Sequence, residues 1–101
     1  MAKQVRIATM PELAMNETDV RVLRLIASRV GRHRKPVEVS QPEIARILGV
    51  SMGTARRGIR SLVNSGLIVV SERYLENGCR LENAYQLTPA GKVVLKALAE
   101  G

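Results

Sequence analysis

Aromatic residues are almost absent from this chain of 101 residues, which contains no Phe, no Trp and only two tyrosines, Tyr74 and Tyr85. Any hydrophobic core must therefore be aliphatic. Apolar residues still make up 46% of the sequence, which argues against wholesale disorder and favours a folded chain. The length suits one small domain.

Cysteine and long apolar runs are equally scarce. Cys79 is the only cysteine, so no disulfide can form within the chain, as is usual for a reducing compartment. No run of about 18 apolar residues is present, and residues 1–13 lack the apolar core of a secretion signal. We therefore expect a cytoplasmic protein with no transmembrane helix and no membrane partner.

Patterns that mark catalytic or metal sites are also missing. His33 and Cys79 are single residues in different loops, and no HExxH, CxxC, GxGxxG or P-loop pattern occurs. The carboxylates are scattered, so none is placed for acid–base catalysis. We expect no enzymatic activity, no cofactor and no metal site, and nothing marks a site for a small-molecule effector.

Positive charge is what the sequence has in excess. The formal net charge is +7, from 16 Lys and Arg against 9 Asp and Glu. Between Arg29 and Arg60, eight basic residues stand against Glu38 and Glu43, a local excess of six charges, and seven of the eight are Arg. Arg suits bidentate contacts to phosphate and guanine. Charge alone fits a polyanionic partner, either nucleic acid or an anionic membrane surface, and since no membrane partner is expected we favour nucleic acid.

Much of this charge lies in residues 40–66, SQPEIARILGVSMGTARRGIRSLVNSG, which predict two short helices joined by a tight turn. Ser40 and Glu43 form the pattern of a capping box at the start of the first helix, with Pro in its first turn. Gly49 is expected to end that helix, and Ser51 to cap the next one. Ile44, Ala45, Ile47 and Leu48 are expected to form the apolar side of the first helix.

The second of these helices, residues 52–65, is apolar on one side and basic on the other. Ala55, Ile59 and Leu62 recur at helical spacing and are expected to face inward, joined by Val63. The outer face then carries Met52, Gly53, Thr54, Arg56, Arg57, Arg60 and Ser61. A helix of this kind is suited to lie in a DNA major groove.

The segments on either side complete a small α+β domain. A first helix is expected from Asn16, a good cap, to about Gly31. After it we expect a brief strand, a two-stranded hairpin with a polar loop, and a last helix that Thr88-Pro89 opens; these lie at residues 37–39, 67–74 with 84–88, and 89–100. Residues 1–15 form an N-terminal arm with a possible short strand at residues 5–7, and the sequence does not decide whether the arm packs or is flexible.

The order helix, strand, helix, helix, hairpin, helix resembles a winged helix-turn-helix domain over residues 16–101. Two fragments carry the resemblance. EIARILGVSMGTARRGIRSLVNSGLI is similar to the DNA-reading segments of GntR-type and MarR-type bacterial regulators, and NAYQLTPAG is similar to the end of a wing in many phage and plasmid regulators. The fold class implied is mainly α with a small β-hairpin.

The resemblance implies that helix 52–65 enters the major groove of double-stranded DNA. Because residues near the start of such a helix reach base edges best, we expect Thr54, Arg56 and Arg57 to contact bases and Arg60 to contact phosphate. Other candidates are Met52 on the same face, Gly53, which lets the helix approach closely, and Ser51 and Gln41, which suit phosphate oxygens at helix N-termini. The alternative for all of these is an ordinary solvated face.

The resemblance also makes the hairpin, residues 72–86, a wing that lies along the DNA backbone or in a minor groove. Arg73 and Arg80 are its candidate contacts. Glu76 and Glu82 would repel phosphate, so a solvated loop remains an equal alternative.

The function implied is a sequence-specific transcriptional regulator, a repressor that occupies a promoter and excludes polymerase. The first and last helices carry more apolar residues than one core needs, which favours a homodimer over the alternative of a single compact core. Two other functions remain open. One is replication initiation or partition at repeated DNA sites of a plasmid or phage, and the other is a protein-interaction module that does not bind DNA, which the excess positive charge argues against.

Overall fold

The structure is a computed structural model that describes residues 4–7, 10–30, 37–71, 76–78 and 83–100. Its elements within these ranges are β1 (Gln4–Ile7), β2 (Met10–Asn16), α1 (Glu17–Val30), β3 (Val37–Glu38), α2 (Gln41–Leu48), α3 (Met52–Asn64), β4 (Ile68–Ser71), β5 (Ala84–Leu87) and α4 (Pro89–Glu100). From α1 onward this is the predicted order of elements, so the predicted fold class is confirmed.

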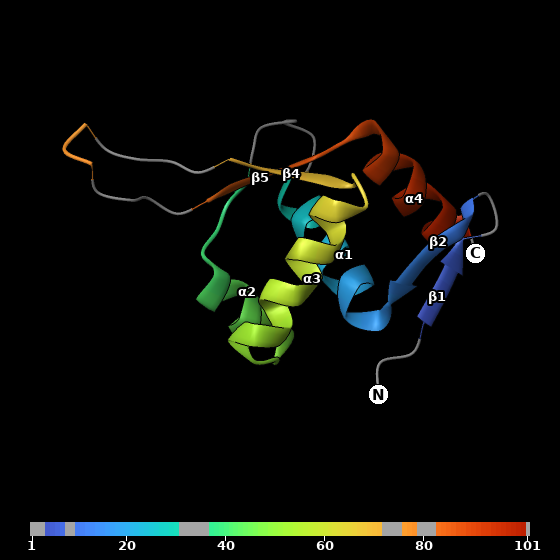
Figure 1. The fold of residues 1–101 in the computed structure, drawn as a ribbon, viewed down its shortest axis with the longest axis horizontal. Coiled ribbons are helices and arrows are strands. Elements are labelled where there is room, and N and C mark those ends of the chain that lie inside the picture. Colours follow the sequence, from blue (N-terminus) through green and yellow to red (C-terminus); the bar gives the residue numbers. More distant parts are fainter. Residues whose placement is uncertain (1–3, 8–9, 31–36, 72–75, 79–82, 101) are drawn as a thin grey trace.

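Helix α1 is the centre of the molecule, since it contacts the other three helices and strands of both sheets. Helices α2 and α3 lie on one side of it, and strands β4 and β5 lie above α3 in this view (Figure 1). Helix α4 and the β1–β2 hairpin lie at the other end of the molecule. The core is aliphatic apart from Tyr85, as the composition requires.

The start of α1 is fixed by a reciprocal pair of hydrogen bonds. The Asp19 N–H donates to Asn16 Oδ1 at 2.8 Å, and the Asn16 N–H donates to Asp19 Oδ2 at 3.3 Å. This confirms Asn16 as the cap. Val22 is fully buried on the side of α1 that faces α3, where it lies against Gly58. The additional apolar side of α1 is therefore buried by contacts within a single chain. This removes one of the two arguments for a homodimer.

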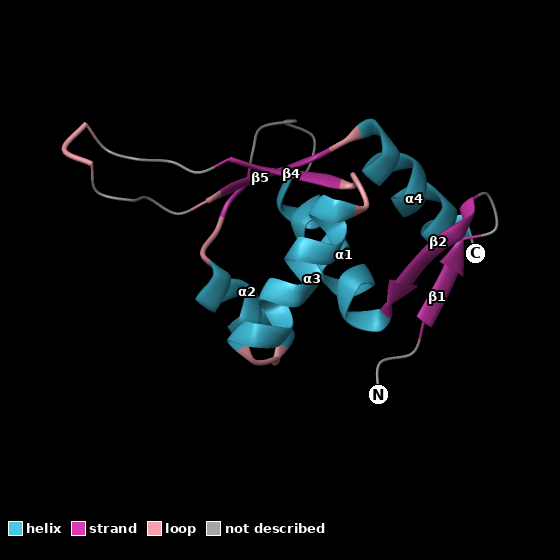
Figure 2. Cartoon of the chain, in the orientation of Figure 1, coloured by secondary structure: helices cyan, strands magenta, loops and turns pink. Residues whose placement is uncertain are grey.

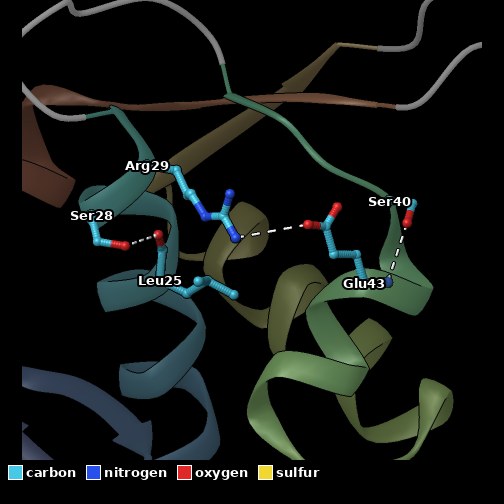
Figure 3. Close-up of polar contacts among 5 residues, drawn as sticks. All are labelled: Leu25, Ser28, Arg29, Ser40 and Glu43. Atoms are coloured by element: carbon cyan, nitrogen blue, oxygen red, sulfur yellow. Dashed lines mark hydrogen bonds and ion pairs between the residues drawn. The ribbon is translucent and has the colours of Figure 1, made fainter.

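Helix α2 begins and ends where the sequence predicts. The Glu43 N–H donates to Ser40 Oγ at 3.2 Å, and Gly49 adopts a left-handed φ of 68° that closes the last turn. The Glu43 carboxylate, expected at the cap amide, forms an ion pair of 3.7 Å with Arg29 at the end of α1 (Figure 3). Ile47 is 43% exposed, so its placement on the buried side was wrong.

Helix α3 buries Ala55, Ile59 and Leu62, as predicted, but Val63 is 39% exposed. The buried side also includes Gly58, which the sequence pattern did not assign. Since successive residues are about 100° apart around a helix, inclusion of Gly58 turns the buried side away from Val63. The cause is α1, which packs against Gly58, so the buried side of α3 is centred nearer to Gly58 than the sequence pattern predicted.

A three-stranded antiparallel sheet in the order β3–β5–β4 covers one end of the helices. Val70 of β4 and Val37 of β3 both pair with Tyr85 of β5. The predicted hairpin is thus confirmed, with an additional strand on its β5 edge. Thr88 then opens α4 as expected, because its Oγ1 accepts the Gly91 N–H at 3.0 Å.

The N-terminal residues form a second hairpin, in which β1 and β2 pair antiparallel. The expected strand at residues 5–7 lies in β1. Strand β1 contacts α1 and α4, and Met15 at the end of β2 is buried in the core. No helix in the described part of the chain is long and apolar enough to cross a membrane.

Candidate nucleic-acid interface

The outer face of α3 gathers the residues that the sequence selected. Gly53, Arg56, Arg57 and Arg60 are exposed on the side opposite the buried seam, and the cap Ser51 is exposed at the N-terminal end. Met52 and Thr54 are half-buried at its edges. The structure therefore brings seven of the ten candidates together on one helix and its cap.

At the start of α3, Ser51, Thr54 and Arg57 form a connected set of hydrogen bonds. The Thr54 N–H donates to Ser51 Oγ at 3.1 Å, and Ser51 Oγ donates to Thr54 Oγ1 at 2.9 Å. Arg57 Nη2 also donates to Thr54 Oγ1, at 3.2 Å. A Cβ added at Gly53 would lie 3.8 Å from Arg57 Nη1, so this guanidinium lies beside the first turn of α3.

Gln41 orients the second guanidinium of the row. Arg56 Nε donates to Gln41 Oε1 at 3.0 Å, which joins the first residue of α2 to the outer face of α3. The bond uses the Nε proton and leaves the terminal Nη1 and Nη2 groups of Arg56 for other partners. Gln41 thus lies in the same surface as the α3 candidates, and its observed contact is to Arg56. Its expected contact to a phosphate stays a prediction.

Ser61 was expected on the outer face, and this was wrong. Its Oγ donates to Asp19 Oδ2 of α1 at 3.0 Å, so the side chain turns towards the interior. In the sequence, Asp19 is an acidic residue in the first turn of a helix, where anions are common. No pattern in the sequence signals a contact between residues 42 positions apart.

Arg21 is a second residue that the sequence analysis missed. Its Nη2 donates to the carbonyl oxygen of Leu48, in the last turn of α2. A cation at this position complements the free carbonyls of a helix C-terminus and supports the turn between α2 and α3. Arg21 therefore stabilises the turn between α2 and α3 through a contact from α1 to the backbone of α2.

The wing candidates Arg73 and Arg80 lie outside the described residues. The structure describes residues 76–78, at the far end of the hairpin, and they are exposed and distant from the helices (Figure 2). Gly78 has a φ of 88°, in the left-handed region that glycine adopts readily in a turn. Among the described residues, no group of three or more His, Cys, Asp or Glu could hold a metal ion.

Comparison with known proteins defines the class of fold. No protein-family model and no curated protein sequence matches the chain. Solved structures of MarR-family regulators do match it, and the similarity covers most of this chain but only about half of theirs. The structure is thus a winged helix-turn-helix domain, as the sequence resemblance predicted.

Three of these structures illustrate the likeness. Staphylococcus aureus MarR, in complex with salicylate and kanamycin, is 20% identical, with 84% of this chain and 50% of that chain covered and a TM-score of 0.64. The S. aureus MepR–DNA complex is 16% identical, with 85% and 55% covered and a TM-score of 0.65. The zinc-responsive ZitR of Lactococcus lactis is 19% identical, with 87% and 54% covered and a TM-score of 0.63. At these identities the likeness establishes the fold alone.

Proposed function

We propose that this protein is a sequence-specific transcriptional regulator that binds double-stranded DNA and acts as a repressor. One observation carries the proposal. Arg56, Arg57 and Arg60 are exposed in a row opposite the buried side of α3, and hydrogen bonds to Gln41 and Thr54 orient two of them. A helix with these properties fits the width of a major groove.

The fold and its structural neighbours support this function. MepR, which has the same fold, is bound to DNA in its structure. The neighbours are described as transcription regulators of the MarR family. Fold alone does not assign a function, so the proposal depends on the side chains of this chain's own α3.

The geometry suggests a distinct role for each candidate on α3. Arg56 would approach a guanine with its two terminal amino groups, because its Nε is engaged by Gln41. Arg57 and Thr54, which share a hydrogen bond, would read adjacent positions as a unit. Arg60, further from the N-terminus of α3, would contact phosphate.

The remaining candidates would place the protein on the DNA backbone. Ser51 and the amides of the first turn of α3 would bind a phosphate oxygen. Met52 and Gly53 would lie close to the groove floor at the same end. The wing, with Arg73 and Arg80, would follow the backbone or enter a minor groove, and its position would set the register of α3.

A homodimer on a two-fold related site completes the proposal. Pairing would double the area of contact with DNA, which is small for one domain. The two-fold symmetry of the dimer would then call for a palindromic DNA site. Helix α4 supports this, because Val93 remains 52% exposed on its surface. Repression would follow from occupancy of a promoter by the bound dimer.

The proposal is tested by selection of bound sequences from a random DNA pool, followed by gel shifts at two salt concentrations. A repressor should recover a palindromic site, and a replication or partition protein should recover tandem repeats. Absence of any shift at low salt would refute DNA binding and favour a protein-interaction module.

Salt dependence gives a separate prediction for Arg60. Each phosphate that a cation neutralises releases counterions, so Arg60→Ala should lower the slope of log affinity against log salt by about one. It should weaken binding to selected and unrelated DNA by a similar factor. Fluorescence anisotropy across a salt series measures both quantities.

Arg24→Ala is the matched control, because Arg24 is an exposed cation on α1 and lies about 200° around that helix from Val22, which faces α3. Its loss removes the same charge and should leave the slope unchanged. Loss of affinity for the selected site alone in Arg60→Ala would instead show that Arg60 contacts a base.

A further inference from the structure

Asp19 is the one polar or charged residue that is buried among the described residues, with 3% of its surface exposed. It is the third residue of α1, and its Oδ2 accepts hydrogen bonds from the Asn16 N–H and from Ser61 Oγ on α3. It therefore joins the cap of one helix to the side of another that lies 42 residues further along the chain.

Capping alone does not explain why this carboxylate is buried. A capping box forms equally well at the surface, where water solvates the acidic side chain. Burial of Asp19 is unfavourable, because its Oδ1 has no hydrogen-bond partner among the described residues and a desolvated carboxylate needs several. What the buried position adds is the bond to Ser61.

The bond to Ser61 lies next to the point where α3 crosses α1. A Cβ added at Gly58 would lie 3.1 Å from Val22 Cγ2, 3.5 Å from Thr18 Cγ2 and 3.7 Å from Asp19 Oδ1, so the two helices are in close contact there. Burial of apolar surface is favourable but not directional, so it does not by itself specify which polar groups of the two helices meet. A hydrogen bond to a charged acceptor is directional and strong.

Rotation of α3 matters for the arginines because they lie on the same helix. Ser61 follows Arg57 by four residues, which places it about 40° around α3 from Arg57. Side chains reach about 5–6 Å from a helix axis, so a rotation of about 20° moves their tips by about 2 Å. Hydrogen bonds tolerate only about 0.5 Å in length.

We propose that Asp19 and Ser61 form a positioning pair that fixes the rotation of α3, so that Arg56 and Arg57 meet base edges correctly. The inference rests on the proposed function, because it assigns a role in base recognition to two residues that do not touch DNA. Loss of the pair should therefore lower sequence specificity in particular. Phosphate contacts tolerate a rotated helix, whereas bidentate base contacts do not.

The test is Ser61→Ala, measured as the ratio of affinity for the selected site to affinity for unrelated DNA. The substitution keeps the charge and favours the helix, but it also removes one hydrogen bond from the buried Asp19 carboxylate, so the thermal midpoint should fall while the protein remains folded. We expect the ratio to fall roughly tenfold, the order of one impaired bidentate contact, while affinity for unrelated DNA stays unchanged. Circular dichroism and the thermal midpoint report the folded fraction.

Three further variants isolate the pair. Ser28→Ala is the matched control, because Ser28 is an exposed serine whose hydroxyl donates to Leu25 within α1. Its ratio should equal that of the wild type. Ser61→Thr restores the hydroxyl and should recover the ratio. Asp19→Asn removes the charged acceptor and should lower the ratio, with no additive loss when combined with Ser61→Ala.

The outcomes of these measurements are distinguishable. A wild-type protein with no preference among DNA sequences overturns the proposed function and this inference with it. A selective wild type whose ratio survives in both Ser61→Ala and Asp19→Asn overturns the inference alone. Lower thermal midpoints with unchanged ratios also overturn the inference, since they would show that the pair only stabilises the fold.

Discussion

Replacement of both Arg56 and Arg57 by Ala is expected to abolish the preference of the protein for its selected site without unfolding it. Both side chains are exposed on α3, so their loss creates no cavity. Each bidentate contact to a base contributes about 1–3 kcal/mol of discrimination, so the double variant should lose about 2–6 kcal/mol. Each single variant should relax the preference at one base position.

Affinity for the selected site and for each of its single-base variants measures this effect directly. Arg56→Lys with Arg57→Lys is the informative control, because lysine keeps the charge and loses the planar, two-donor geometry. The lysine variant should retain affinity for unrelated DNA and still lose specificity. If the double alanine variant ranks the sequences as the wild type does, α3 does not read bases through these residues.

A single methyl group at position 91 is expected to destabilise the domain by about 3 kcal/mol or more, through steric overlap in a closely packed site. A Cβ at Gly91 would overlap the carbonyl oxygen of Leu67, far inside van der Waals contact. That oxygen belongs to the backbone and also accepts the Thr88 N–H at 3.1 Å, so it cannot move aside independently. Gly91→Ala would force α4 away from the start of β4.

Urea unfolding followed by circular dichroism measures this loss. Gly53→Ala is the matched control, because it makes the same change in a helix where the nearest atom lies 3.8 Å away. It should leave stability unchanged or raise it by up to about 1 kcal/mol. Equal stabilities for Gly91→Ala and the wild type would show that α4 does not pack as closely on Leu67 as the structure has it.

The helix boundaries could be predicted from the sequence because the interactions that set them are local. Asn16, Ser40, Ser51 and Thr88 all cap the helices that they were expected to cap, and each accepts an N–H from three residues further on. Such bonds depend only on neighbouring residues. The winged helix-turn-helix order followed from these boundaries and the hairpin.

Contacts between distant elements could not be predicted in this way. The exposure of Val63 depends on the side from which α1 approaches α3, and the bond of Arg21 to Leu48 joins residues 27 positions apart. The Asp19–Ser61 pair is of the same kind. Helical periodicity predicts which residues of a helix lie on the same side. The neighbouring helix that packs against it determines which of those residues are buried.

The sequence predicted which residues share the surface of the candidate site. It was less able to predict the hydrogen bonds between those residues. Charge and periodicity together placed the arginines on one side of α3. The hydrogen bonds of Arg56 to Gln41 and of Arg57 to Thr54 depend on how α2 and the turn meet α3. The individual roles of these residues on DNA, and those of Arg73 and Arg80, remain predictions.

The central claim is that the outer face of α3 lies against DNA. A titration of ¹⁵N-labelled protein with its selected site, followed by nuclear magnetic resonance, tests this most directly. We expect the largest shifts at the amides of residues 51–60 and at the Nε signals of Arg56 and Arg57, with α4 affected less. Shifts concentrated on α4 and β1–β2, with the α3 signals unmoved, would contradict the account.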